Sequence, residues 1–339
     1  MSRREWPADE GVSSVVLLSV GRASIALAGM STSSRRRGRP RTCGERDQQL
    51  RRGPHVSLDF DVPPFRPDPD TVARPMPIWR GADPAMLLRG TAYDGQKLRA
   101  VPRLDQQGTS VWVMEVHRGY EAVDAWETFH ARYPQTGLWP VIATDRTCAD
   151  VADPIEQRYR LGRVDADPVT EDGRSWLYDE FASLLRREGS NEDFVARQDQ
   201  DWSPAEFARV EENFRNFDWT DIWATVGHEY AHLLLVPAPY PWLVPGRLGW
   251  VGACNYGIGW RDHARILRRW QHLWRVDLVA LDRDTMWLRH MQPITDRNTA
   301  LAAAMEAFLY CSDTVNSDHQ TLDNLARWFL EPMWRLWWD

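Results

Sequence analysis

The sequence of 339 residues lacks several features that would assign a function directly. Lysine is almost absent, since Lys97 is its single instance and arginine supplies nearly all of the positive charge. The four cysteines lie far apart without a C-x-x-C pair, which excludes a disulfide framework and a cysteine-type zinc site and favours a reducing cytoplasm. No stretch approaches the roughly 18 consecutive apolar residues of a membrane helix, so we expect no membrane span.

Common catalytic and nucleotide-binding signatures are also missing. No G-x-S-x-G occurs, so a serine hydrolase of the nucleophile-elbow type has no support. The glycine-rich segment 249–259 matches neither G-x-G-x-x-G nor the P-loop, and Asp262 at the start of the next helix would repel a phosphate. We therefore expect this segment to form a turn against the core. Its composition would also suit the floor of a small-ligand pocket.

The net charge of −7 is unevenly distributed along the chain. Residues 1–53 carry eleven arginines against five acidic residues, a local balance of +6, which leaves −13 for the remainder. The acidic body argues against nucleic acid as the main partner, because neutralising phosphates requires a basic face. An arginine-rich tail that binds acidic partners is the alternative for the first 53 residues.

Composition predicts three regions. Residues 1–75 are rich in arginine, serine and proline, which predicts a disordered extension; a signal peptide and a start at Met30 are the alternatives for its first part. We expect a smaller α+β region over residues 76–200 and a C-terminal domain over residues 201–339.

Hydrophobic periodicity places the elements of the N-terminal region. Strands are expected at 98–101, 111–116 and 138–143, and helices at 121–132, 176–187 and 203–217. Pro140 favours an edge position for the third strand, because proline donates no hydrogen bond to a neighbour. The polar stretch 145–174 is expected to be a loop.

The C-terminal domain follows a strand-helix-hairpin-helix-helix-strand pattern, which predicts an α+β fold. The expected elements are 233–236, 262–274, 276–281, 285–288, 299–309, 322–330 and 333–338. Ten of the nineteen tryptophans lie from His232 onward. Because such large aromatic groups stabilise a protein by burial, we expect the last strand to close the core, with Trp337 and Trp338 on opposite faces.

A series of motifs in this region resembles a known bacterial family. The first motifs are Leu234–Ala238, Leu248-Gly249-Trp250 and a Gly/Cys/Asn loop. They are followed by a helix with Trp270, by Tyr310–Asp313 and Thr321–Ala326, and by a final Trp337-Trp338-Asp339. Together they resemble the domain of unknown function 4253 (DUF4253). The resemblance implies a shared fold and a bacterial origin, but no activity, since the family has none assigned. The chain departs from the family at Cys254-Asn255, where asparagine usually comes before cysteine.

The sequence His228-Glu229-Tyr230-Ala231-His232 matches H-E-x-x-H. On a helix, His228 and His232 would share a face and bind one zinc ion while Glu229 activates its water. A third ligand is not evident: a nearby carboxylate would have to be Asp262, or His263 would serve. The alternative is two partly exposed histidines where a helix gives way to a strand.

Five residues in the family-like motifs are candidates for contact with a ligand. They are Trp250, Asn255, Asp284, Cys311 and Asp313. Because no complete catalytic set accompanies them, we expect a cytoplasmic, non-catalytic module that binds a protein or a small molecule without a cofactor. The alternative is a zinc-dependent hydrolase built on the histidine motif.

Overall fold

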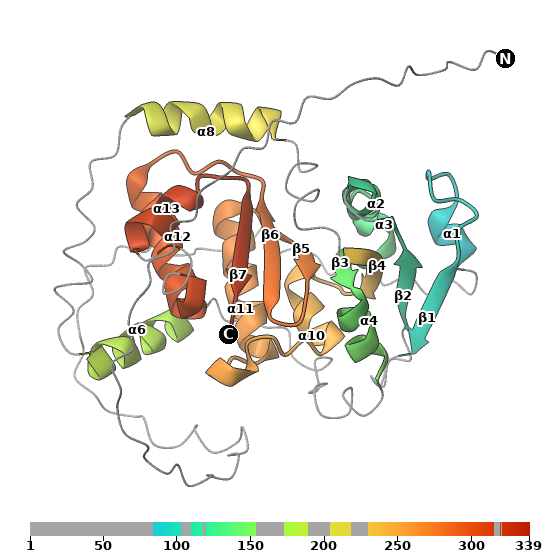
Figure 1. The fold of residues 1–339 in the computed structure, drawn as a ribbon, viewed down its shortest axis with the longest axis horizontal. Coiled ribbons are helices and arrows are strands. Elements are labelled where there is room, and N and C mark those ends of the chain that lie inside the picture. Colours follow the sequence, from blue (N-terminus) through green and yellow to red (C-terminus); the bar gives the residue numbers. More distant parts are fainter. Residues whose placement is uncertain are drawn as a thin grey trace, which may run out of the picture. The chain divides into compact units, whose positions relative to one another are not determined.

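A seven-stranded mixed sheet organises the part of the chain that the computed structural model describes (Figure 1). Its strand order is β1-β2-β4-β3-β5-β6-β7. The described residues are 84–102, 110–117, 120–153, 173–188, 204–217, 230–314, 319 and 321–339. The extension predicted over residues 1–75 lies outside them.

The strands lie where alternating or continuous apolar runs predict them. Their bounds are β1 Leu98–Pro102, β2 Ser110–Glu115, β3 Leu138–Thr144, β4 Tyr230–Pro237, β5 Val276–Leu281, β6 Thr285–His290 and β7 Met333–Trp337. Neighbouring strands are antiparallel except β3 and β5, which run parallel. The mixture of this sheet with helices confirms the predicted α+β class.

The edge position predicted for the strand with Pro140 is wrong. Strand β3 is central, paired with β4 along its whole length and with β5 on its other side. Its ladder with β5 covers only Ile142 and Ala143, so Pro140 lies before the paired stretch and its missing N–H is tolerated there. Strand β3 thereby joins residues before position 200 to the C-terminal strands in one sheet.

Helices cover the sheet and follow most of the predicted ranges. Their bounds are α1 Ala85–Leu88, α2 Tyr120–His130, α3 Tyr133–Thr136, α4 Asp145–Ala152, α6 Arg174–Glu188, α8 Pro204–Asn216, α10 Val244–Leu248, α11 Trp260–Trp274, α12 Arg297–Tyr310 and α13 Leu322–Trp328. Asp296 and Thr321 cap α12 and α13, since their side chains accept hydrogen bonds from backbone N–H groups.

Helix α4 replaces part of the loop predicted over 145–174. Its apolar face is short, and its N-cap is Thr144, whose hydroxyl accepts a hydrogen bond from the Thr147 N–H. Cys148 and Val151 are buried beneath it. The helix therefore begins at the last residue of β3, so it starts beside the carboxyl end of a central strand.

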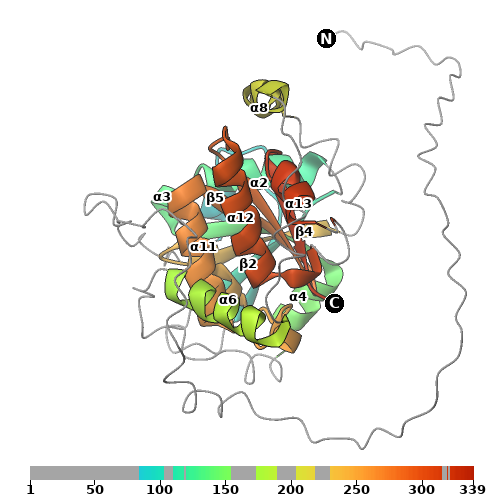
Figure 2. The same cartoon turned by 90° about the vertical axis from the view of Figure 1, so that its left-hand side faces the viewer.

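The aromatic core of the C-terminal part lies between α11, α12 and the last strands. Figure 2 shows α11 and α12 side by side, and the buried Arg269 and Glu306 join them with a bidentate ion pair. Trp334 and Trp338 are almost fully buried, whereas Trp337 is only partly so. The expectation that the last strand closes the core is confirmed. None of the helices within the described ranges is long and apolar enough to cross a membrane.

Candidate functional site

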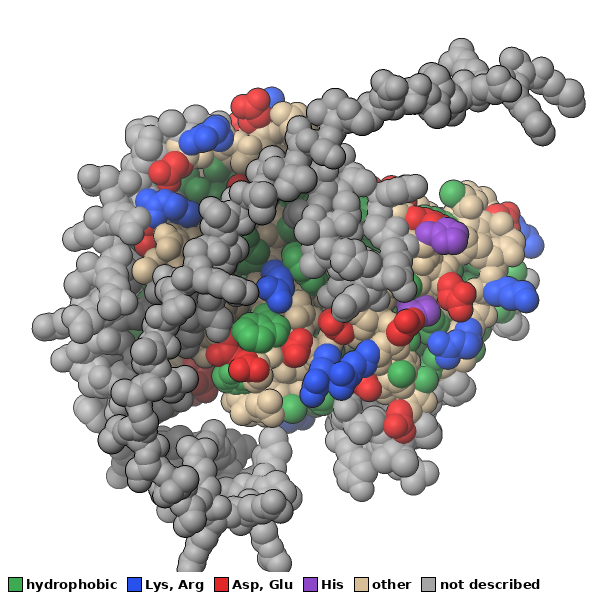
Figure 3. Space-filling model, viewed as in Figure 1, with side chains coloured by type: hydrophobic (Ala, Val, Ile, Leu, Met, Phe, Trp, Pro, Cys, Tyr) green, Lys and Arg blue, Asp and Glu red, His purple; other side chains and the backbone are tan. Residues whose placement is uncertain are grey.

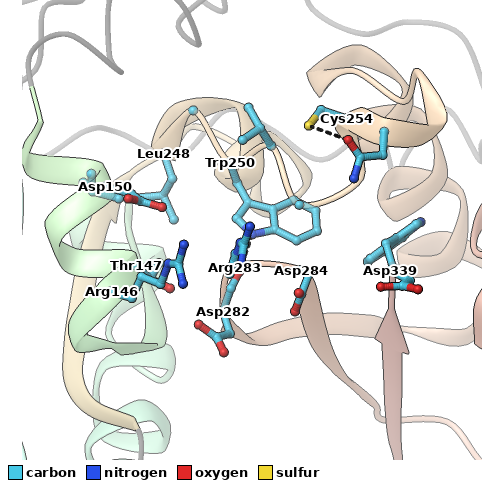
Figure 4. A pocket seen from close by; sticks show the side chains of 16 residues that line it. Arg146, Thr147, Asp150, Leu248, Trp250, Cys254, Asp282, Arg283, Asp284 and Asp339 are labelled. Carbon is cyan, nitrogen blue, oxygen red and sulfur yellow. Dashed lines mark hydrogen bonds between the residues drawn. The ribbon is translucent and has the colours of Figure 1, made fainter. Parts of the chain in front are cut away.

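A cavity of about 490 Å³ lies at the carboxyl ends of the parallel strands β3 and β5 (Figure 4). Its walls are α4, the segment 248–255, the β5–β6 turn at 282–284, and the last residues of the chain. The carboxyl ends of parallel strands are the usual place for ligands in open α/β sheets. The volume also falls in the range of roughly 300–1,000 Å³ that small-molecule sites occupy.

Three of the five predicted ligand residues line this cavity. They are Trp250, Asn255 and Asp284, which come from two segments about thirty positions apart in the sequence. Asp313 does not line it but accepts a hydrogen bond from the Asp339 backbone N–H at 2.9 Å. Cys311 lies deeper still and is fully buried. The fold thus brings the five predicted residues to one region: three line the cavity, and Asp313 and Cys311 lie behind its lining.

Trp250 forms the floor of the cavity and is held from several sides. Its indole N–H donates to the backbone carbonyl of Asp282 at 2.5 Å. The ring meets Trp338 edge-on at 5.5 Å and lies 5.0 Å from the His263 ring. Gly252 passes so close that a Cβ there would overlap the Trp250 ring and lie 2.8 Å from the Arg283 carbonyl oxygen. The floor is therefore a fixed aromatic surface.

Charged side chains surround this floor. The lining includes two arginines and four aspartates: Arg146, Arg283, Asp150, Asp282, Asp284 and Asp339. Figure 3 shows acidic and basic side chains next to one another on the surface between α4 and the end of β7. At neutral pH these six groups sum to −2, so the cavity presents both signs with an excess of negative charge.

A chain of hydroxyl groups fixes the left wall of the cavity in Figure 4. The Thr144 hydroxyl donates to the Asp282 carboxylate at 2.7 Å, and the Thr147 hydroxyl lies 3.1 Å from it. Thr147 in turn donates to the carbonyl of Leu281 at 3.3 Å. Both threonines are buried, so these bonds attach the start of α4 to the end of β5. One oxygen of Asp282 is thereby committed to structure.

The opposite wall is an acidic cluster at the ends of β6 and β7. The Trp338 N–H donates to the Asp284 carbonyl at 3.0 Å, which places Asp339 beside the turn. Asp313 accepts hydrogen bonds from the Asp339 N–H and from the Tyr256 hydroxyl. Partial burial, then the bond to Asp313 and the nearby charge of Asp339, raise the pKa of Tyr256 to about 12. The shift is consistent with a negative potential on this side.

The two cysteines of the region differ in exposure. Cys311 donates to the Trp337 carbonyl at 2.9 Å and accepts from Thr314, and its burial raises the thiol pKa to about 12. It is therefore a protonated core group at neutral pH and unsuited to nucleophilic attack. Cys254 is exposed on the rim of the cavity next to Asn255.

The zinc alternative requires a helix at the histidine motif, but the part of the motif that the structure describes is a strand. Tyr230, Ala231 and His232 belong to β4, whose extended backbone cannot place residues four apart on one helical face. The Nε2 atom of His232 lies 2.6 Å from the Asp145 carboxylate. His228 and Glu229 lie outside the described residues. The strand prevails because the apolar run at 233–236 pairs on both sides, with β2 and β3.

His263, the third candidate metal ligand, lies inside α11 and is fully buried. Its Nδ1 lies 2.5 Å from the Tyr310 hydroxyl. Burial lowers the pKa of this imidazole to about 3, so the ring is neutral at physiological pH. Within the described ranges, no three His, Cys, Asp or Glu side chains are grouped so that they would hold a metal ion.

Sequence reasoning missed the residues that complete the cavity. Arg146, Thr147 and Asp150 fall in the predicted loop, and Asp282 and Arg283 in the turn between two predicted strands, where no binding role was expected. The one available signal was Thr144-Asp145 followed by apolar residues three and six positions on, which is a short helix start after a buried strand. Their approach to Trp250 depends on the pairing of β3 with β5, which the sequence does not display.

The fold and the cavity define an α+β protein with an open polar pocket at the carboxyl ends of its two parallel strands. Residues 232–339 match the family model described as domain of unknown function (DUF4253). The resemblance predicted from the motifs is thus confirmed over that range. No curated protein and no solved structure matches the chain. Four lining residues, Arg146, Thr147, Asp150 and Val151, lie outside the matched range.

Proposed function

We propose that the protein is a cytoplasmic, non-catalytic binding module that holds a small polar molecule in this cavity. The observation that carries the proposal is the cavity itself, whose Trp250 floor is fixed while charged groups remain available around it. A rigid apolar surface with a few convergent polar groups is the usual composition of a small-molecule site. A small molecule fits better than a protein partner because the site is concave.

The chemistry of the lining favours binding over catalysis. The sixteen residues that line the cavity include no histidine. General acid–base catalysis near pH 7 works best with a group that titrates there. Cys254 is the one thiol among the lining residues. We therefore assign the charged groups to recognition.

A screen of ligand classes tests the proposal. Thermal unfolding of the full chain is measured with amino acids, amines, organic acids and neutral sugars, because a ligand at 100 times its Kd stabilises the folded state by about 2.7 kcal/mol. Hits are checked by isothermal titration calorimetry. The variant Asn255→Trp, which places an indole in the cavity, should abolish binding.

The matched control is Gln135→Trp, on an exposed position of α3 away from the cavity. It introduces the same side chain and should leave binding unchanged. Binding that survives Asn255→Trp, or a failure of every class to bind, contradicts the proposed function.

A further inference from the structure

We infer that the ligand of this cavity is a zwitterion, a small organic molecule that carries both a carboxylate and an ammonium or guanidinium group. The carboxylate would bind Arg146 and Arg283, and the cationic group would bind Asp284 and Asp339. This inference rests on the proposed function, because it names the class of molecule that the same cavity takes.

Two guanidinium groups provide the anion-binding side. Arg146 projects from the first turn of α4, and Arg283 stands at the β5–β6 turn, so separate elements bring them to one cavity (Figure 4). Among the described residues, neither guanidinium forms a hydrogen bond or an ion pair with a neighbour. Arginine binds carboxylates through two parallel N–H···O bonds, a geometry that a monovalent carboxylate of a ligand would complete.

The cation-binding side combines carboxylates with aromatic rings. Asp284 and Asp339 are adjacent because the Trp338 N–H donates to the Asp284 carbonyl, and Asp313 stands directly behind Asp339. The Asp284 carboxylate accepts one hydrogen bond, from the Thr285 hydroxyl at 3.2 Å, which leaves further lone pairs for a ligand. Trp250 and Trp338 line the same region, and aromatic faces attract cations.

The balance of charges disfavours ligands with charge of a single sign. Four aspartates against two arginines in the lining would repel a phosphate or a dicarboxylate. A simple amine would satisfy the aspartates but leave both arginines without a ligand group to bind. A bare metal ion would need a group of three suitable ligands, and the described residues contain none. A zwitterion satisfies both walls at once.

The test compares ligands that differ by one charged group. Binding to the full chain is measured by calorimetry for L-arginine and for ω-amino carboxylates of increasing length, from glycine to 6-aminohexanoate. Each is paired with its decarboxylated amine and with its deaminated acid. At the best length, the zwitterion should bind about tenfold or more tightly than either partner, since each lost charge-assisted contact is worth at least that factor.

Two variants test the anion-binding side and the cation-binding side separately. Arg283→Gln should weaken the zwitterion about tenfold and leave the amine unchanged, whereas Asp284→Asn should weaken both the zwitterion and the amine. Asn at 284 keeps an oxygen for the Thr285 hydroxyl, so the turn is preserved. Arg89→Gln and Asp124→Asn, at exposed positions outside the cavity, are the matched controls and should change nothing.

The outcomes distinguish this inference from the proposed function. The zwitterion inference is overturned if an amine binds as tightly as its zwitterion, or if a neutral sugar binds while every zwitterion fails. Either result leaves the proposed binding function intact. Insensitivity to both variants also overturns the zwitterion inference, because the walls are then not used. If no compound of any class binds, both proposals are wrong.

Discussion

Two groups of charged residues, one in the core and one around the cavity, are treated in opposite ways by the fold. In the core, Arg269 and Glu306 are 0% and 1% exposed and meet through bonds of 2.7–3.1 Å, with the Trp270 N–H donating to the same carboxylate. Around the cavity, Arg146 and Arg283 stand near four aspartates without pairing. The core pair joins two helices, whereas Asp282 at the cavity joins the start of α4 to the end of β5 through Thr144.

The difference indicates what each group contributes. Buried charges survive only when paired, so the core pair is explained by the packing of α11 against α12. Exposed charges beside a fixed tryptophan need no pairing for stability, and unpaired arginines add little to it. The two cavity arginines are therefore free to serve recognition, while the core pair serves the fold.

The largest effect is expected from breaking the core pair. Glu306→Ala leaves the Arg269 guanidinium and the Trp270 N–H buried without their acceptor, which should cost about 3–5 kcal/mol in the free energy of unfolding. Urea denaturation followed by tryptophan fluorescence measures it. The double variant Arg269→Met, Glu306→Leu removes both charges and should recover most of the loss. A loss below 1 kcal/mol for Glu306→Ala would show that the pair is not buried as described.

A second prediction concerns the pH dependence of stability and rests on His263, which lies between the core and the cavity. The pKa of His263 is about 3 in the folded protein and about 6.5 in the unfolded chain. Since the unfolded state binds the proton more readily, stability is complete above pH 6.5 and falls as the pH drops toward 3. The contribution is up to roughly 3 kcal/mol between pH 6.5 and pH 4.

Chemical denaturation across this pH range measures the slope. His263→Gln removes the titrating ring and should flatten the profile relative to the wild-type protein. Asn255→Gln, at an exposed position of the cavity, should leave the slope unchanged. The explanation fails if the two variants have the same slope, because His290, whose pKa burial lowers to about 4, would then account for the dependence.

The contrast between core and cavity also explains which features were predictable. The core follows local rules: the periodic apolar residues of α11, the alanine-rich run of α12 and the caps at Asp296 and Thr321 are visible in the sequence. The central position of β3 was not visible in the sequence, because Pro140 lacks an N–H and so favours an edge strand. Only the short pairing with β5 shows why proline is tolerated in a central strand.

Only some of the residues that line the cavity were predictable from the sequence, for a similar reason. Trp250, Asn255 and Asp284 lie in motifs of the family-like region, whereas Arg146 approaches them from more than a hundred positions away through the parallel pairing of β3 and β5. The spacing of the histidine motif alone fits a helix, whereas the apolar run after it pairs as a strand on both sides. Tertiary pairing overrides a five-residue pattern.

The smallest effect is expected at the floor of the cavity, where packing and recognition meet. Gly252→Ala adds a methyl group against the Trp250 ring and the Arg283 carbonyl, so the loop must shift, at a cost of about 1–2 kcal/mol. Urea denaturation gives this cost, and ligand titration gives the loss of binding. In the background of Trp250→Leu, the ring is gone and the same substitution should cost less, a coupling that a double-mutant cycle detects. Additive costs would mean that Gly252 does not position Trp250, and the fixed aromatic floor would lose its main support.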